Sequence, residues 1–254
     1  MRRHDLLARL HELLQPRSYL EVGVSTGASM ALSRTRSIGV DPFFTVKHEL
    51  RCDLHLVRTT SDEFFAREAP LEHLDEPQVD LAFVDGMHLA EYALRDVINL
   101  ERYTHPASVL VLDDMLPPHP DVAARERALG RARGMWTGDV YKVLPVLRRH
   151  RPDLICLEVD TKPTGVVVVL GLDARSRVLL EAYDDLVPEL VTSDPQHVPA
   201  EVLGRTRALD AERLLALPLW RGLRELQGAE PELARSRVRE LVRASGLDQP
   251  ATVG

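Results

Sequence analysis

Short apolar runs alternate with segments of helical periodicity over the first two thirds of the chain. Seven of these runs have the length of a strand, and turn-forming or acidic residues bound them. They lie at 19–22, 37–41, 53–59, 79–85, 108–114, 154–159 and 165–170. Helices are expected at 6–14, 25–33 and 88–102, and a further helix is expected to begin with Ser61 as its cap. This alternation predicts a mostly parallel α/β sheet with helices on both faces, and the tight turn at 160–163 predicts an antiparallel last strand.

The pattern changes after residue 173, where the chain becomes rich in Leu, Glu and Arg and shows no convincing strand. A helical stripe recurs near the end, at Ala234, Val238, Leu241 and Val242. The sequence therefore predicts an α/β domain over 1–173 and a helical extension over 174–254. We expect the extension to pack against the domain or to support a homodimer.

Composition narrows the class of protein. The chain has 254 residues, of which 44% are hydrophobic and 28% charged, and a formal net charge of −7 that argues against a nucleic-acid binder. The longest apolar stretch, 166–170, is too short to cross a membrane, and the amphipathic start does not resemble a signal peptide. Cys52 and Cys156 have no metal-type spacing, so we expect reduced thiols in a cytoplasmic protein.

The turn after the first strand, Glu21-Val22-Gly23-Val24-Ser25-Thr26-Gly27, combines an acid with two glycines. Glycine permits a tight turn and lets backbone N–H groups approach a ligand. The turn lacks the lysine of a phosphate-binding P-loop and the Gly-x-Gly-x-x-Gly spacing of a dinucleotide site. It therefore predicts a site for a nucleotide-like ligand that meets a carboxylate.

Several strands end in acids, at Glu21, Asp41, Asp85 and the pair Asp113–Asp114. The carboxyl ends of parallel strands meet at one sheet edge, where ligands bind in open α/β folds. Asp41 lies where a carboxylate takes the two hydroxyls of a ribose. Asp85, Asp113 and Asp114 could hold Mg²⁺, which prefers carboxylate oxygens, although solvated turn acids would give the same pattern.

Three further features could belong to this edge. His88, which follows Asp85 by three residues, could accept a proton or be an ordinary first-turn residue of the next helix. The arginines of 125–133 could neutralise an acidic acceptor, but we favour a solvated helix face. Met135 and Trp136 could form an apolar lid or simply pack the insertion.

These motifs together resemble class I S-adenosylmethionine-dependent methyltransferases. The resemblance rests on 21–27, on Asp41, on 84–92 through 111–114, and on 136–142, and it covers about residues 15–172. It is strongest for bacterial small-molecule O-methyltransferases, including the metal-dependent sugar enzymes. Those enzymes usually carry Asp-Gly-Asp where this chain has Asp85-Gly86-Met87-His88, so His88 would have to act as the base. The helical extension has no counterpart in the resemblance.

The resemblance implies a Rossmann-like, seven-stranded sheet and assigns roles to the motif residues. Glu21 would lie near the amino-acid end of S-adenosylmethionine, the backbone at Gly23 and Gly27 near its methionine and ribose portions, and Asp41 at the ribose hydroxyls. The remaining cofactor contacts would come from Ser25, Thr26, Phe43 (covering the adenine), Ser61, Asp62 and Asp85. Mg²⁺ would bind Asp85, Asp113 and Asp114, and His88 would take the proton of the acceptor.

The expected function is methyl transfer to a hydroxyl of a small metabolite. The low aromatic content, 5%, favours a sugar or other hydroxylated natural product over a catechol. A metal-independent methyltransferase is the nearest alternative. Two other classes remain: a nicotinamide-dependent oxidoreductase, whose pyrophosphate Glu21 would repel, and a non-catalytic cofactor-binding scaffold whose helical tail serves assembly.

Overall fold

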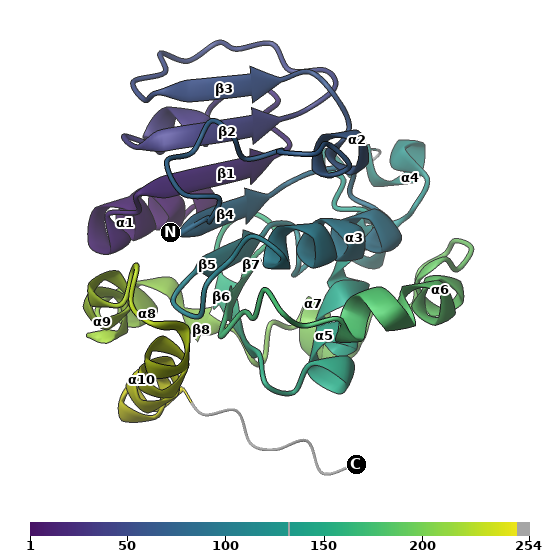
Figure 1. Ribbon diagram of the computed structural model, residues 1–254. Coiled ribbons are helices and arrows are strands. Elements are labelled where there is room, and N and C mark those ends of the chain that lie inside the picture. The colour runs from purple at the N-terminus through teal and green to yellow at the C-terminus, as the bar shows by residue number, and fades with distance from the viewer. Residues whose placement is uncertain (132, 248–254) are drawn as a thin grey trace.

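The computed structural model describes residues 1–131 and 133–247, and these residues build one eight-stranded sheet (Figure 1). The strand order is β3-β2-β1-β4-β5-β7-β6-β8. Strands β1 to β5 run parallel, and β7 is antiparallel to its neighbours β5 and β6. The strands are β1 (Ser18–Val22), β2 (Arg36–Val40), β3 (Leu54–Val57), β4 (Leu81–Val84), β5 (Val109–Leu112), β6 (Ile155–Asp160), β7 (Val166–Leu170) and β8 (Leu209–Asp210).

The seven predicted strands and the antiparallel last strand of the domain are confirmed. The expectation of no strand after residue 173 is wrong, because β8 pairs in parallel with the end of β6, Leu209 opposite Val159. A two-residue strand is too short to show the alternation that identifies strands in a sequence.

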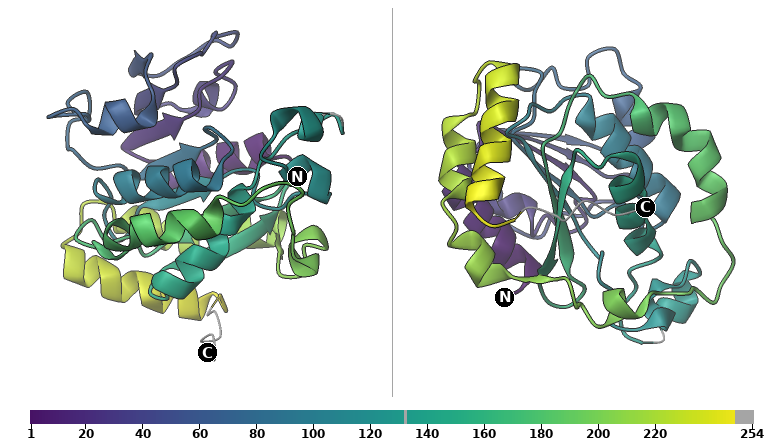
Figure 2. Two further views of the ribbon diagram at one scale, coloured as in Figure 1. Left: turned by 90° about the vertical axis from the view of Figure 1, so that its right-hand side faces the viewer. Right: turned by 90° about the horizontal axis from the view of Figure 1, so that it is seen from below.

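Helices cover both faces of the sheet, as Figure 2 shows from below. One face packs against α2 (Ser61–Phe65), α3 (Ala90–Glu101), α5 (Val143–His150) and α6 (Val178–Leu190). The other packs against α1 (Arg3–Leu14), α8 (Ala211–Leu215), α9 (Leu219–Glu225) and α10 (Pro231–Ala244). Shorter elements are η1 (Met30–Leu32), η2 (Pro120–Ala123), α4 (Arg127–Arg131), η3 (Val140–Lys142) and α7 (Ala200–Leu203).

The segment after residue 173 is mostly helical, as predicted, and it contributes to both faces. Helix α6 joins the apolar cluster of α3 and α5, while α9 buries Trp220 beside α1. A role in dimer formation stays a prediction. Among the described residues, no helix is long and apolar enough to span a membrane.

Two predicted helix features are wrong for local reasons. The crossover from β1 to β2 forms only the short helix η1, because Gly23, Ser25 and Gly27 all adopt positive φ angles that no α-helix contains. The cap of α2 is Thr60, one residue before the predicted Ser61. The Thr60 hydroxyl accepts a hydrogen bond from the backbone N–H of Glu63, and Ser61 is the first helical residue.

Candidate active site

The glycine turn after β1 lies against the loop after β4. Gly23 has φ of 91°, and a Cβ at this position would lie 1.9 Å from the backbone carbonyl oxygen of Asp85. Only glycine allows this approach. The turn and the loop that carries Asp85 are therefore in direct backbone contact at the carboxyl edge of the sheet.

Asp41, at the end of β2, holds the other side of this turn. Its Oδ2 accepts a hydrogen bond from the backbone N–H of Ser25 at 2.7 Å, and its Oδ1 accepts one from the N–H of Phe43 at 2.6 Å. Each carboxylate oxygen keeps a lone pair for a further donor. The Phe43 ring is 86% exposed, so it is available to cover a ligand held by Asp41.

Ser61 and Asp62 lie in the first turn of α2 and interact with α3. Asp62 forms an ion pair with Arg95, and the Ser61 hydroxyl bonds to Asp96. Their contact with adenine stays a prediction, as does the role of Thr26, whose carbonyl oxygen accepts a hydrogen bond from the N–H of Lys47 at 2.9 Å.

Glu21 does not face the turn. Its carboxylate is fully buried and accepts hydrogen bonds from the Tyr19 hydroxyl and the Ser29 hydroxyl, both at 2.6 Å. Burial raises the pKa of Glu21 to about 8, against the opposing effect of these two bonds. Glu21 therefore braces β1 against the segment before η1, and its place near the amino-acid end of the cofactor stays a prediction.

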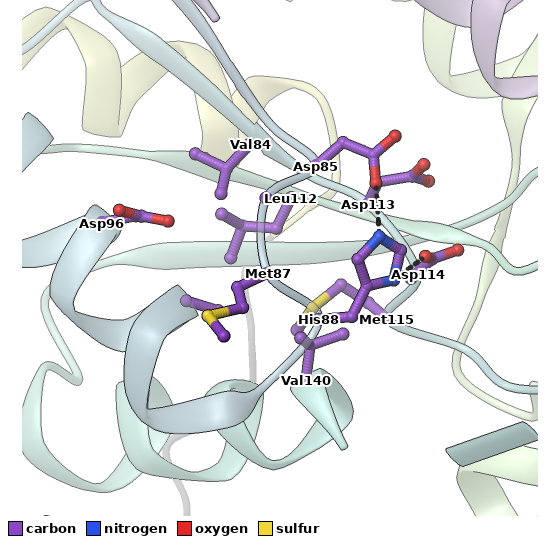
Figure 3. Close-up of a pocket in the computed structure, with 12 residues that line it drawn as sticks. Val84, Asp85, Met87, His88, Asp96, Leu112, Asp113, Asp114, Met115 and Val140 are labelled. Carbon is purple, nitrogen blue, oxygen red and sulfur yellow. Dashed lines mark ion pairs between the residues drawn. The ribbon is translucent and has the colours of Figure 1, made fainter. Parts of the chain in front are cut away.

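The predicted acids converge around His88, as Figure 3 shows. His88 Nδ1 lies 2.8 Å from Asp114 Oδ2, and Nε2 lies 3.3 Å from Asp85 Oδ1. His88 lies in the loop before α3 with φ of 61°, so it is not a first-turn helix residue. The imidazole thus stands between carboxylates from the ends of β4 and β5.

Burial lowers the pKa of His88, but the ion pairs with Asp114 and Asp85 outweigh burial and raise the pKa to about 10. An imidazolium cannot accept a proton. The predicted role of His88 as a base therefore holds only when another cation neutralises the two carboxylates, because a bound ion reverses the local effect on pKa.

The insertion packs over His88. The Trp136 ring stacks on the imidazole with centroids 5.0 Å apart and an interplanar angle of 15°. A Cβ at Gly138 would lie 1.6 Å from the His88 carbonyl oxygen, so the insertion also touches the loop backbone. Of the two predicted lid residues, Trp136 covers the base candidate itself.

The expectation of a solvated arginine face is wrong for Arg125. Its guanidinium donates to Glu91 at 2.6 and 2.9 Å and to Asp139 at 2.8 Å, in a half-buried position. Fork-shaped bonds of this kind fix geometry as well as charge. Arg125 therefore ties the insertion to α3.

Arg3 is the residue that the sequence patterns missed. From the first turn of α1 it bonds to the carboxylate of Asp113, and its Nη2 lies 3.5 Å from Asp85 Oδ2. Its Nη1 lies 3.9 Å from Asp114 Oδ1. The doublet Arg2-Arg3 before an amphipathic helix carries no signal for this contact in the linear sequence.

Asp113, the carboxylate that Arg3 bonds to, is buried. Burial raises the pKa of Asp113 well above its usual range, and the charges of Asp114 and Asp85 add to the effect. Its Oδ1 has no hydrogen-bond partner among the described residues. A buried carboxylate oxygen without a donor is costly, and a water, an ion or a ligand would satisfy it.

The donor set fits a divalent cation. Ligand atoms of Asp85, His88 and Asp114 all lie within 4.8 Å of one another. The predicted set had Asp113 in place of His88; Asp113 bonds to Arg3, and its part in a metal site stays a prediction. Two carboxylates with an imidazole suit Mn²⁺ or Fe²⁺ better than Mg²⁺, which prefers oxygen donors.

A small pocket extends from this cluster beneath the start of α3 (Figure 3). Asp96 of α3 lines it, and burial raises the pKa of this carboxyl to about 7. Its Oδ1 also lacks a partner among the described residues. The other lining residues include Val84, Gly86, Met87, Leu112, Met115 and Val140.

The chain is similar to cofactor-bound Rv0187 from MTB, with 17% identity, a TM-score of 0.47, and coverage of 67% of this chain and 79% of that one. It is similar to the O-methyltransferase TomG from Streptomyces achromogenes, with 18% identity, a TM-score of 0.43, and 66% and 78% coverage. It is also similar to an O-methyltransferase from Bacillus cereus, with 15% identity, a TM-score of 0.44, and coverage of 66% of this chain and 80% of that one.

No curated protein matches the chain. The family model of a methyltransferase domain, however, matches residues 20–115. This range begins in β1, contains the glycine turn and Asp41, and ends just after Asp113 and Asp114. Residues 20–115 are therefore similar to a methyltransferase domain, the same family that the sequence motifs resemble.

Proposed function

We propose that this protein transfers a methyl group from S-adenosylmethionine to a hydroxyl of a small metabolite. The observation that carries the proposal is the backbone contact between the glycine turn and the loop of Asp85 and His88. A cofactor on the turn would present its methyl group beside the acid cluster. Within a methyltransferase domain, that arrangement joins a donor site to an acceptor site.

The donor half of the site consists of the turn from Gly23 to Gly27, with Asp41 and Phe43. Asp41 already fixes the turn through Ser25, and its remaining lone pairs are suited to two ribose hydroxyls. A fixed turn reduces the freedom of the bound cofactor, and alignment of the methyl group with the attacking oxygen is a large part of such catalysis.

The acceptor half consists of Asp85, His88 and Asp114. A divalent ion held by the carboxylates of Asp85 and Asp114 would orient the acceptor hydroxyl, lower its pKa and leave the imidazole of His88 uncoordinated. With both carboxylates neutralised, His88 is suited to take the hydroxyl proton, and Trp136 shields it from water. A hydroxylated sugar or natural product can hydrogen-bond to the acidic side of the pocket, which a planar aromatic acceptor uses less well.

Isothermal titration calorimetry with S-adenosylmethionine, S-adenosylhomocysteine and NAD⁺ tests the donor half. We expect the first two to bind and Asp41→Asn to weaken them by about tenfold or more, because charge-assisted bonds to ribose are lost. Asp53→Asn is the matched control, since the exposed Asp53 carboxylate pairs with Arg36 and His73, away from the glycine turn. Binding of NAD⁺ alone would support the oxidoreductase instead.

A panel of hydroxylated acceptors tests the acceptor half, with methylated product detected by mass spectrometry in the presence of Mn²⁺, Mg²⁺ or a chelator. We expect methyl transfer to hydroxyl groups, and we expect the chelator to suppress this transfer. Transfer that the chelator leaves unchanged would favour the metal-independent alternative, for which Arg3 already supplies a positive charge at the cluster. Cofactor binding without transfer to any acceptor would favour the scaffold.

A further inference from the structure

We propose that Arg3 is a built-in competitor for the divalent cation: its guanidinium lies on the acid cluster and weakens binding of the ion there. This inference rests on the cation site of the proposed function. It adds a residue outside the methyltransferase domain, from a helix that precedes β1.

Arg3 contacts all three carboxylates of the cluster. Its Nη1 bonds to Asp113 and lies 3.9 Å from Asp114, and its Nη2 lies 3.5 Å from Asp85. The three acids come from the ends of two adjacent strands, β4 and β5. The guanidinium therefore lies where the charge of the cluster is concentrated, against oxygens that an entering ion also needs.

The backbone holds Arg3 in this position. Its N–H lies 3.4 Å from the carbonyl oxygen of Lys162, and the N–H of Lys162 donates to the Met1 carbonyl at 3.0 Å. Arg2 completes a parallel bridge to the same lysine. The first turn of α1 is thus attached to the β6–β7 turn, and Arg3, with 29% of its side chain exposed, is not a loose surface arginine.

The cluster still lacks one positive partner. Asp113 is 1% exposed, and its Oδ1 has no hydrogen-bond partner among the described residues, although Oδ2 bonds to Arg3. The cluster therefore keeps an attraction for a second cation. A unit charge within about 4 Å opposes an entering ion by enough to change its affinity about tenfold or more at a partly buried site.

Titration of the full-length protein with Mn²⁺, followed by calorimetry and by electron paramagnetic resonance, tests the inference. We expect Arg3→Gln to bind Mn²⁺ about tenfold more tightly than the wild type. Arg3→Lys keeps the charge on a point-like group that cannot span three carboxylates, so it should show a smaller gain. Arg9→Gln, which removes an exposed arginine of the same helix, should match the wild type.

An unchanged or weaker affinity in Arg3→Gln, or an equal gain in Arg9→Gln, would overturn the inference. If Arg3→Gln does not fold by circular dichroism, a gain in Arg3→Lys supports the inference and its absence overturns it. If Arg3→Gln binds Mn²⁺ and the wild type does not, the inference holds, but the cation is no longer part of the proposed function. Equal Mn²⁺ binding by the wild type and Arg3→Gln would keep the cation in the proposed function and overturn the inference. If neither protein binds Mn²⁺, both the cation and the inference are overturned, and the calorimetry with S-adenosylmethionine is unaffected.

Discussion

The two ends of β4 carry the same kinds of side chain in opposite electrostatic states. At the amino end, Asp80 accepts hydrogen bonds from the Arg17 backbone at 2.6 Å, from the Arg17 guanidinium at 3.0 and 3.1 Å, and from His105 Nε2 at 2.7 Å. Burial raises the pKa of Asp80, but His105 and Arg17 outweigh burial and lower the pKa to about 2. This carboxylate is fully satisfied.

At the carboxyl end of β4, one arginine and one histidine form ion pairs with three carboxylates. Arg3 and His88 contact Asp85, Asp113 and Asp114, and the Oδ1 of Asp113 remains without a partner among the described residues. The pKa of Asp113 is raised well above its usual range by burial and by its acidic neighbours. Residue type therefore does not separate a structural ion pair from a binding site; the number of unmade bonds does.

Removal of the charge at the amino end should have the largest effect on stability. In Asp80→Asn, Arg17 and the buried His105 lose their anionic partner, so we expect the free energy of unfolding to fall by about 3 kcal/mol. Urea denaturation at neutral pH measures this change. A loss below about 1 kcal/mol would show that the satisfied cluster is not a stabilising one.

Separate replacement of His88 and His105 by glutamine should distinguish an effect on activity from an effect on stability. We expect His88→Gln to lower kcat about 100-fold, equivalent to about 2.7 kcal/mol, because the proton acceptor is lost. His105→Gln should leave kcat of the folded enzyme unchanged and lower its stability. Steady-state kinetics with Mn²⁺ titration provide the readout. A parallel loss of Mn²⁺ affinity in His88→Gln would make His88 a ligand and not a base.

The pH dependence of stability should differ between the two ends. Asp80 has a folded pKa of about 2 and an ordinary carboxyl pKa near 3.9 when unfolded, so its stabilisation is present above about pH 4 and is lost as the pH falls toward 2. The shift corresponds to roughly 2 kcal/mol. Urea midpoints of the wild type and Asp80→Asn between pH 5 and pH 2.5 should therefore converge at low pH, and parallel curves would contradict this assignment.

Asp113→Asn should have the smallest effect on stability. The folded pKa of Asp113 is raised, so its ionised form is disfavoured by the fold and its contribution to stability falls as the pH rises above the unfolded pKa. A neutral amide removes that cost but also the charge that attracts Arg3, and we expect a net change below about 1 kcal/mol at neutral pH. A loss above about 2 kcal/mol would place Asp113 with Asp80 as a structural acid.

Sequence patterns predicted the strands and the convergence of Asp85, His88, Asp113 and Asp114, because the ends of parallel strands must share an edge. They failed where one side chain decides the outcome. Arg3 reaches the cluster from a helix far from it in sequence, and its i, i+4 neighbours carry no trace of that contact. The predicted helix at 25–33 failed because Ser25 and Gly27 adopt positive φ angles, which the pattern of apolar residues does not reveal.

The stacking of Trp136 on His88 also gives the site its own optical probe. An indole in face-to-face contact with a cationic ring has a different excited state from one beside a neutral ring, because the charge acts on the indole π-system. The chain has two tryptophans, and the other, Trp220, is buried in the apolar cluster beside α1. Fluorescence from Trp136 should therefore follow the charge of His88 over a constant background from Trp220, so that loading of the acid cluster can be followed in the unlabelled protein.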